Sequence, residues 1–167
     1  MQLQFKEIIR KVPNFPKAPI EFLDISPVLA SPDYLQVLLS QMGALVDWAS
    51  IDAVIGIESR GFILGSALAA KHQKGFIPCR KAGKLPPPVV SESYQLEYGE
   101  ATLEMQAGKG RVLIVDDVLA TGGTLQATIN IAEKCGYHPV DLLVMINISQ
   151  LNSFTFRGNP VKALLKY

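Results

Sequence analysis

The chain has 167 residues, which is enough for one domain with a sizeable core. Hydrophobic residues make up 49% and charged residues 19%, and the net charge of +1 gives no general field for nucleic acid or membrane. No apolar run approaches the ~18 residues of a membrane span, and no signal peptide is expected. The cysteines Cys79 and Cys135 form neither a disulfide framework nor a metal spacing, so we expect a cytoplasmic protein.

The N-terminal third predicts short elements joined by loops. Apolar residues at helical spacing indicate an amphipathic helix over Leu3–Val12, and the prolines of 13–19 predict a loop. Ile20–Pro27 is predicted to be a short edge strand. A helix-start pattern, serine then proline then an acid, predicts a helix over Ser31–Trp48.

Two buried strands follow, and each ends in a polar loop. Asp52–Ile57 reads as the first strand, and its loop, 58–61, opens a small apolar helix that packs on the sheet. Gly75–Cys79 reads as the next strand. Three cations follow it within five residues, at Arg80, Lys81 and Lys84, a pattern that is usually a solvated turn.

Residues 87–106 predict a hairpin flap. Two weakly alternating segments, Val90–Gly99 and Thr102–Gln106, flank a bend at Gly99 and Glu100. Such a flap would close over a substrate and expel water, which competes as a nucleophile.

The most informative stretch is Arg111–Thr124. An apolar run, Val112–Val115, predicts a buried parallel strand, and Asp116 and Asp117 end it. Small residues and two glycines follow, and then a helix that ends near Gly136. The loop therefore lies at the carboxyl end of a strand, where open α/β sheets bind ligands.

The chemistry of this loop suits a phosphate and a sugar together. Gly122 and Gly123 allow backbone N–H groups to approach an anion, and Thr121 and Thr124 add hydroxyl donors. Carboxylates repel phosphate, so the acid pair has hydroxyls, as in a ribose diol, or a divalent cation as its target. The stretch is neither a Walker loop nor a dinucleotide fingerprint.

Together the elements predict an α/β fold. A mainly parallel, twisted sheet flanked by helices would carry a flexible hairpin flap, about 85–106, and a small N-terminal hood, about 1–34. The core would run over about 35–167, with further strands at Val140–Ile148 and Val161–Leu165.

The stretch from the apolar strand through Asp-Asp to Ala-Thr-Gly-Gly-Thr resembles the phosphoribosyl-pyrophosphate loop of type I phosphoribosyltransferases. Three further segments resemble the adenine-using branch of that family. They are Phe22–Pro27, Arg80–Pro86 and Ser93–Gly99.

The resemblance implies transfer of a phosphoribosyl group from phosphoribosyl pyrophosphate to adenine, giving AMP and pyrophosphate, with Mg²⁺ bound mainly through the substrate pyrophosphate rather than by protein ligands. The same resemblance implies a homodimer, because Arg80 would reach into the neighbouring subunit's site.

The resemblance implies a separate group of residues for each part of the substrates. Backbone groups at Ala120, Thr121, Gly122, Gly123 and Thr124 would fix the 5′-phosphate, and Asp116 and Asp117 the ribose hydroxyls. Ser59 and Arg60 in their loop, with Lys81 and Lys84, would hold the leaving pyrophosphate. Phe22 and Val118 would sandwich the base, Leu23 would belong to the base-reading segment, and Glu97, with Tyr98 beside it, would transfer the proton.

Two alternatives stay open. Leu23 stands where the family usually has arginine, which leaves room for a sister enzyme that uses hypoxanthine, guanine or xanthine. A nucleotide-sensing regulator on the same scaffold would need a basic face or an added domain, so we expect neither nucleic acid nor membrane as a partner.

Overall fold

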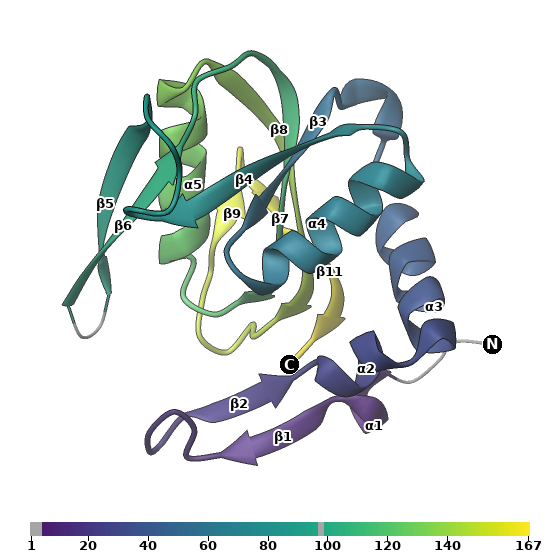
Figure 1. Ribbon diagram of the computed structural model, residues 1–167. Coiled ribbons are helices and arrows are strands. Elements are labelled where there is room, and N and C mark those ends of the chain that lie inside the picture. The colour runs from purple at the N-terminus through teal and green to yellow at the C-terminus, as the bar shows by residue number, and fades with distance from the viewer. Residues whose placement is uncertain (1–4, 97–98) are drawn as a thin grey trace. The chain divides into compact units, whose positions relative to one another are not determined.

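The computed structural model describes residues 5–96 and 99–167 (Figure 1). Contacts divide the chain into two compact units, residues 1–41 and 42–167. In the described residues, no helix is long and apolar enough to cross a membrane.

The N-terminal unit begins with a short helix and a hairpin. These are α1 (Phe5–Ile8), β1 (Arg10–Pro13) and β2 (Glu21–Asp24), followed by α2 (Ser26–Ala30) and the start of α3 (Pro32–Gly43). The predicted edge strand is therefore confirmed as β2.

The predicted helix over Leu3–Val12 is wrong after Ile8. Residues of β1 pair antiparallel with β2, with Arg10 opposite Asp24. The Arg10 guanidinium donates to the Asp24 carboxylate at 2.6 and 3.1 Å. Helical spacing is a local signal, and here pairing with a distant strand overrides it.

The predicted helix up to Trp48 is also too long, because α3 ends at Gly43. Trp48 instead starts a 3₁₀ turn, η1 (Trp48–Ser50), and its indole donates to the Gly43 carbonyl at 2.8 Å. The Trp48 ring stacks on His72 at 3.9 Å, so Trp48 has a packing role.

The larger unit is built on a seven-stranded sheet in the order β11-β8-β7-β3-β4-β6-β5. Its strands are β3 (Ala53–Ile57), β4 (Gly75–Lys81), β5 (Val90–Leu96), β6 (Gly99–Met105), β7 (Gly110–Leu119), β8 (Tyr137–Asn147) and β11 (Lys162–Lys166). The pairs β3–β4, β3–β7, β7–β8 and β8–β11 are parallel, and β5–β6 is an antiparallel hairpin. The predicted α/β fold with a mainly parallel sheet is confirmed.

Two helices flank this sheet, α4 (Arg60–Lys71) and α5 (Gly123–Lys134). The connections β3-α4-β4 and β7-α5-β8 run outward in opposite directions from the centre of the sheet. Right-handed crossovers then place the helices on opposite faces, as Figure 1 shows. A second small hairpin, β9 (Thr155–Phe156) and β10 (Asn159–Pro160), lies between β8 and β11 in the sequence.

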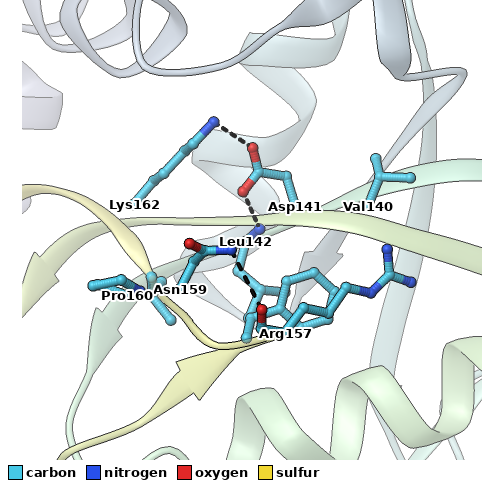
Figure 2. A pocket seen from close by; sticks show the side chains of 9 residues that line it. Val140, Asp141, Leu142, Arg157, Asn159, Pro160 and Lys162 are labelled. Carbon is cyan, nitrogen blue, oxygen red and sulfur yellow. Dashed lines mark hydrogen bonds and ion pairs between the residues drawn. The ribbon is translucent and has the colours of Figure 1, made fainter.

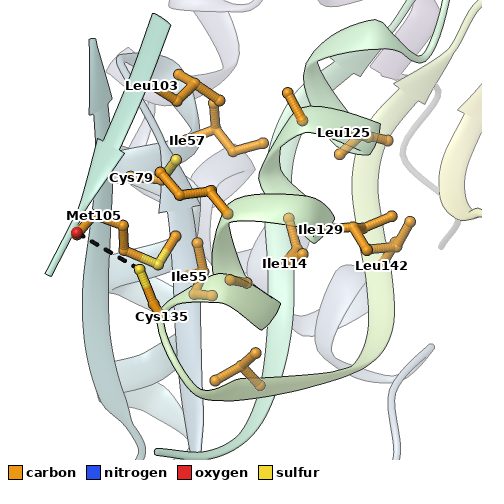
Figure 3. Close-up of a cluster of buried hydrophobic side chains, with 14 of the residues drawn as sticks. Ile55, Ile57, Cys79, Leu103, Met105, Ile114, Leu125, Ile129, Cys135 and Leu142 are labelled. Atoms are coloured by element: carbon orange, nitrogen blue, oxygen red, sulfur yellow. Dashed lines mark hydrogen bonds between the residues drawn. The ribbon is translucent and has the colours of Figure 1, made fainter. Parts of the chain in front are cut away.

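The main core lies between α5 and the sheet (Figure 3). Ile55, Ile114 and Leu142 are contributed by neighbouring parallel strands, and Leu125 and Ile129 by the helix. Burial of such side chains is worth roughly 1.5–3 kcal/mol each. It therefore fixes the two strand ends, β3 and β7, that carry the polar loops.

Candidate active site

A cleft of about 1090 Å³ opens at the carboxyl ends of β3 and β7. The loop after β3, the turn after β4, the acid pair of β7 and the flap hairpin all line it. Four polar segments that are far apart in sequence therefore meet at the edge of the sheet where ligands of this fold class bind.

The acid pair lies in the floor of the cleft. Asp117 is 4% exposed and forms an ion pair with the Arg60 guanidinium, and its N–H donates to the Asp116 carboxylate at 2.9 Å. Burial, and then the charge of Asp117, raise the pKa of Asp116 well above its ordinary range. Asp116 is therefore a carboxyl group that a ligand or cation would help to ionise.

A glycine allows α4 to begin directly against the acid pair. A Cβ at Gly61 would lie 2.8 Å from the Val115 carbonyl oxygen and 3.0 Å from Oδ1 of Asp116. The absence of a side chain here brings the first turn of α4, with Arg60, onto the end of β7.

The glycine loop after β7 forms a smaller cavity of about 80 Å³, lined among others by Ala120, Thr121, Gly122 and Thr124. Gly122 has φ of +96°, which disfavours other residues, and α5 begins at the next residue, Gly123. The cavity lies at a helix N-terminus, where unpaired N–H groups and the helix dipole favour an anion.

Two residues that the sequence did not single out support this loop. The Asn152 amide donates to the Ala120 carbonyl at 2.7 Å and to the Asn147 side chain and the Ile148 carbonyl. A Cβ at Gly122 would lie 2.6 Å from the Phe154 ring. The anion loop is thus held by the segment that follows β8.

The turn after β4 is organised by Glu58, which sequence reasoning left in the loop motif without a role. The Glu58 side chain is 9% exposed, and its carboxylate accepts from Lys84 at 2.5 Å, the Lys81 amide at 2.9 Å and Arg80 at 3.4 Å. Burial opposes ionisation, but these donors outweigh it and lower the pKa of Glu58 to about 2. The peptide bond between Glu58 and Ser59 is cis.

The flap hairpin lies along α5. Glu92 accepts from Asn130 at 3.1 Å and forms an ion pair with Lys134. The Tyr94 hydroxyl lies 3.4 Å from that of Thr124. Alternate residues of β5 therefore fasten the base of the flap to the helix that starts at the anion loop.

Most predicted site residues meet in these two cavities. The large cleft is lined by Ser59, Arg60, Lys81, Lys84, Asp116, Asp117, Val118, Ala120 and Thr124. Arg80 turns away from the cleft lining, towards Glu58 and over the Phe62 ring at 5.7 Å.

Four predicted residues lie outside the described part of the larger unit. Glu97 and Tyr98 lie outside the described residues. Phe22 and Leu23 belong to β2 of the N-terminal unit, where the Phe22 ring contacts Phe15 at 5.3 Å. The Leu23 side chain is 6% exposed, so its contact with a ligand would be through the backbone.

A third cavity, of about 250 Å³, lies against β8, β11 and the β9–β10 hairpin (Figure 2). Its polar lining includes the Lys162–Asp141 ion pair at 2.5 Å and the exposed Arg157. None of the predicted site residues lines it.

Comparisons with known proteins agree with this geometry. Residues 35–151 match the phosphoribosyl transferase domain. The chain is 48% identical over 165 residues to the adenine phosphoribosyltransferase of Bdellovibrio bacteriovorus, covering 99% of this chain and 100% of that protein. The chain belongs to the adenine phosphoribosyltransferase family.

Solved structures of adenine phosphoribosyltransferases share the fold. The enzyme of Rhodothermus marinus matches with a TM-score of 0.87 and 43% identity over 97% of this chain and 96% of its own. The enzyme of Saccharomyces cerevisiae, complexed with an imino-altritol bisphosphate and adenine, matches with a TM-score of 0.84 and 31% identity over 95% and 93%.

Proposed function

We propose that this chain transfers the 5-phosphoribosyl group of phosphoribosyl pyrophosphate to adenine, giving AMP and pyrophosphate, a purine-salvage reaction. The observation that carries the proposal is the meeting of the acid pair, the anion loop and the cation turn in one cleft. Family membership supports adenine as the base.

The glycine loop and the acid pair would bind the ribose 5-phosphate part. The small cavity at the start of α5 suits the 5′-phosphate, with backbone N–H groups and the hydroxyls of Thr121 and Thr124 as donors. Asp116 and Asp117 would accept from the ribose 2′- and 3′-hydroxyls. Together they would hold the sugar at both ends and orient its reacting carbon.

The cations on the other side of the cleft would stabilise the leaving pyrophosphate. Arg60 is held by Asp117, and Lys81 and Lys84 follow β4, so positive charge is already placed where negative charge develops. The sugar carbon becomes cation-like as pyrophosphate departs, and preorganised charges stabilise that state with little rearrangement.

Recognition of the base rests on residues that stay predictions. Stacking by Phe22 and Val118 would give affinity for any purine, and Glu97, beside Tyr98, would manage the proton on a ring nitrogen. We expect Glu97→Gln to lower kcat by about a hundredfold, the scale of general acid–base catalysis.

Mg²⁺ would enter the site bound to the pyrophosphate group of the substrate. Within residues 5–96 and 99–167, no group of three or more His, Cys, Asp and Glu side chains forms a metal site. The acid pair alone provides two carboxylates, and Mg²⁺ is commonly held by one or two carboxylates, substrate phosphates and water. The residues present therefore fit an ion bound mainly through pyrophosphate oxygens, which would neutralise charge on the leaving group.

We also propose a homodimer and a cytoplasmic location. Ile63 of α4 and Phe76 of β4 are 46% and 36% exposed, an apolar surface that a second copy could cover. Arg80 lies over the Phe62 ring, and that ring packs against Phe76. The two cysteines are free and buried, which suits a reducing compartment.

The test is a base-specificity assay. The chain is incubated with phosphoribosyl pyrophosphate, Mg²⁺ and each of several purines and pyrimidines, and pyrophosphate release is followed. We expect kcat/KM for adenine to exceed that for hypoxanthine or guanine by about a thousandfold or more, because a site that hydrogen-bonds one base rejects its analogues strongly. Equal rates with hypoxanthine or guanine would contradict adenine as the substrate.

A further inference from the structure

The loop that follows β4 is tied down by two carboxylates from different strand ends. Glu58 accepts from the Lys84 ammonium at 2.5 Å and from the Lys81 N–H at 2.9 Å. Glu104 accepts from the Gly83 N–H at 2.9 Å. Glu58 and Glu104 therefore both hold the segment of residues 80–84 in place.

Only one of these two carboxylates touches cationic side chains in the described hydrogen bonds and ion pairs. Glu58 contacts Lys84 and also Arg80, at 3.4 Å, whereas Glu104 contacts a backbone amide. The Arg80 guanidinium in turn donates to the Lys84 carbonyl at 3.3 Å. Glu58, Arg80 and Lys84 thus form a closed network rather than separate surface pairs.

Glu58 differs from an ordinary surface acid in its burial. Its side chain is 9% exposed, whereas those of Lys84 and Arg80 are 47% and 33% exposed. The Glu58 carboxylate is therefore the buried end of the network, and the side chains of Lys84 and Arg80 are its more exposed members. Lys84 and Glu58 line the same cleft, so this buried end lies at the wall of the proposed pyrophosphate site.

We propose that Glu58 is a positioning residue, which holds Lys84 in the geometry that binds the leaving pyrophosphate. The proposal rests on the function proposed above. A free lysine side chain loses rotamer entropy when it is fixed by a ligand. Because the ion pair with Glu58 already restricts Lys84 in the empty site, binding of pyrophosphate would lose less free energy on ordering the Lys84 side chain.

The first test replaces Glu58 by glutamine and measures pyrophosphate binding by titration calorimetry with Mg²⁺ present. The amide oxygen can still accept from the Lys81 N–H, so the change removes charge and leaves the backbone contact. We expect binding to weaken about tenfold, the scale of a lost charged hydrogen bond. In steady state, KM for phosphoribosyl pyrophosphate should rise similarly, and KM for adenine should change less than about twofold.

The matched control is Glu104→Gln, which alters the other carboxylate of the same loop without touching a cation. We expect its pyrophosphate affinity to stay within about twofold of the unaltered chain. Glu58→Asp keeps the charge and should bind more tightly than Glu58→Gln. Unchanged or tighter binding by Glu58→Gln, or equal weakening by both glutamine variants, would overturn the proposal.

A double-mutant cycle covers the case in which Glu58→Gln is poorly folded. Lys84→Gln is made alone and together with Glu58→Gln, and thermal unfolding is recorded for each variant. If Glu58 acts through the cations, the combined loss of affinity should be smaller than the sum of the single losses. Additive losses, or equal rises in both KM values together with a lowered Tm, would show a role in folding only and overturn the proposal.

The binding measurement also separates this proposal from the proposed function. Pyrophosphate titration needs neither adenine nor turnover. A chain that binds pyrophosphate in a Glu58-dependent way but does not use adenine would contradict the proposed reaction and leave the positioning role supported. An unaltered chain that does not bind pyrophosphate contradicts both.

Discussion

Two loops at the same edge of the sheet have the same local architecture and opposite chemistry. Each follows a buried parallel strand, β3 or β7, and each opens a helix, α4 or α5. The loop after β3 is rich in charges that already have partners, through the Glu58–Lys84 and Arg60–Asp117 pairs. The loop after β7, residues 120–123, has no charged side chain of its own, although Asp116 of the preceding strand also lines its cavity.

The difference shows two ways of holding a phosphate. A backbone nest is shaped by chain geometry and needs no counter-ion, so it suits the phosphate that stays on the product. Cationic side chains form stronger hydrogen bonds with a phosphate than backbone N–H groups do, but they need a buried carboxylate to hold them when the site is empty. They suit the pyrophosphate, whose charge changes during the reaction.

The largest expected effect comes from the acid pair, which joins the two loops. Replacing Asp116 and Asp117 together by asparagine should lower kcat/KM by about a thousandfold or more, since it removes the negative charge that would face the ribose hydroxyls and that pairs with Arg60. Steady-state pyrophosphate release measures the loss, and circular dichroism checks folding. Near-normal rates would contradict the ribose role.

The neutral loop can be distorted without altering charge. Gly122→Ala forces a side chain onto a residue with φ of +96°, at 2.6 Å from the Phe154 ring. We expect KM for phosphoribosyl pyrophosphate to rise about tenfold and stability to fall by ~1–3 kcal/mol.

The control for this variant is Gly158→Ala. Gly158 has φ of +79° but no heavy atom within 4 Å of an added Cβ, and it lies in the β9–β10 turn. We expect it to lose about 1 kcal/mol of stability and keep its KM. The same KM change in both variants would show that the loop geometry does not matter for binding.

The flap allows a further test of the loop after β7, because the described contacts join strand β5 of the flap to α5, the helix that begins at this loop. Glu92→Gln removes the ion pair with Lys134, and we expect faster hydrogen exchange over Val90–Leu96 and a loss in kcat/KM of about threefold. Glu21→Gln alters the exposed Lys11–Glu21 pair, at 3.8 Å, and should change neither. Unchanged hydrogen exchange in Glu92→Gln would show that the Glu92–Lys134 ion pair does not hold β5 against α5.

The smallest expected effect concerns pH and stability. Burial and the charge of Asp117 raise the pKa of Asp116 in the folded state, so ionising Asp116 costs stability as pH rises above its unfolded value of about 4. Asp116→Asn should therefore raise Tm by a few degrees at pH 7, with the gain fading towards pH 4.

Glu58 should behave in the opposite way. Its folded pKa of about 2 lies below the unfolded value, so its contribution is present above about pH 4.5 and lost as pH falls towards 2. Glu58→Gln should lower Tm at pH 7, and the difference should shrink in acid. Calorimetric scans from pH 7 to 3 compare the two variants, and shifts of the same sign at pH 7 would contradict the assigned environments.

Much of the site was readable from local sequence. The apolar run ending in Asp116 and Asp117, the glycines after it and the cations after β4 are contiguous patterns. The structure brings the acids and two of the cations to one cleft, and Gly122 to the small cavity at the start of α5. Contacts across long sequence separations were not readable. Lys84 lies 26 residues from Glu58, Asn152 lies 32 from Ala120, and Tyr94 lies 30 from Thr124.

By itself, the sequence determined the order of strands and helices in the larger unit, because an unbroken apolar run or a helical repeat must bury its apolar face. It also determined the chemistry of each loop, because the residue types that bind phosphate, cations and hydroxyls are few. Only the tertiary structure decided that Arg10–Pro13 is a strand, that Arg60 pairs with Asp117, and that Glu58 holds the cation turn. Each of these depends on a partner that folding brings close, and a local pattern carries no information about that partner.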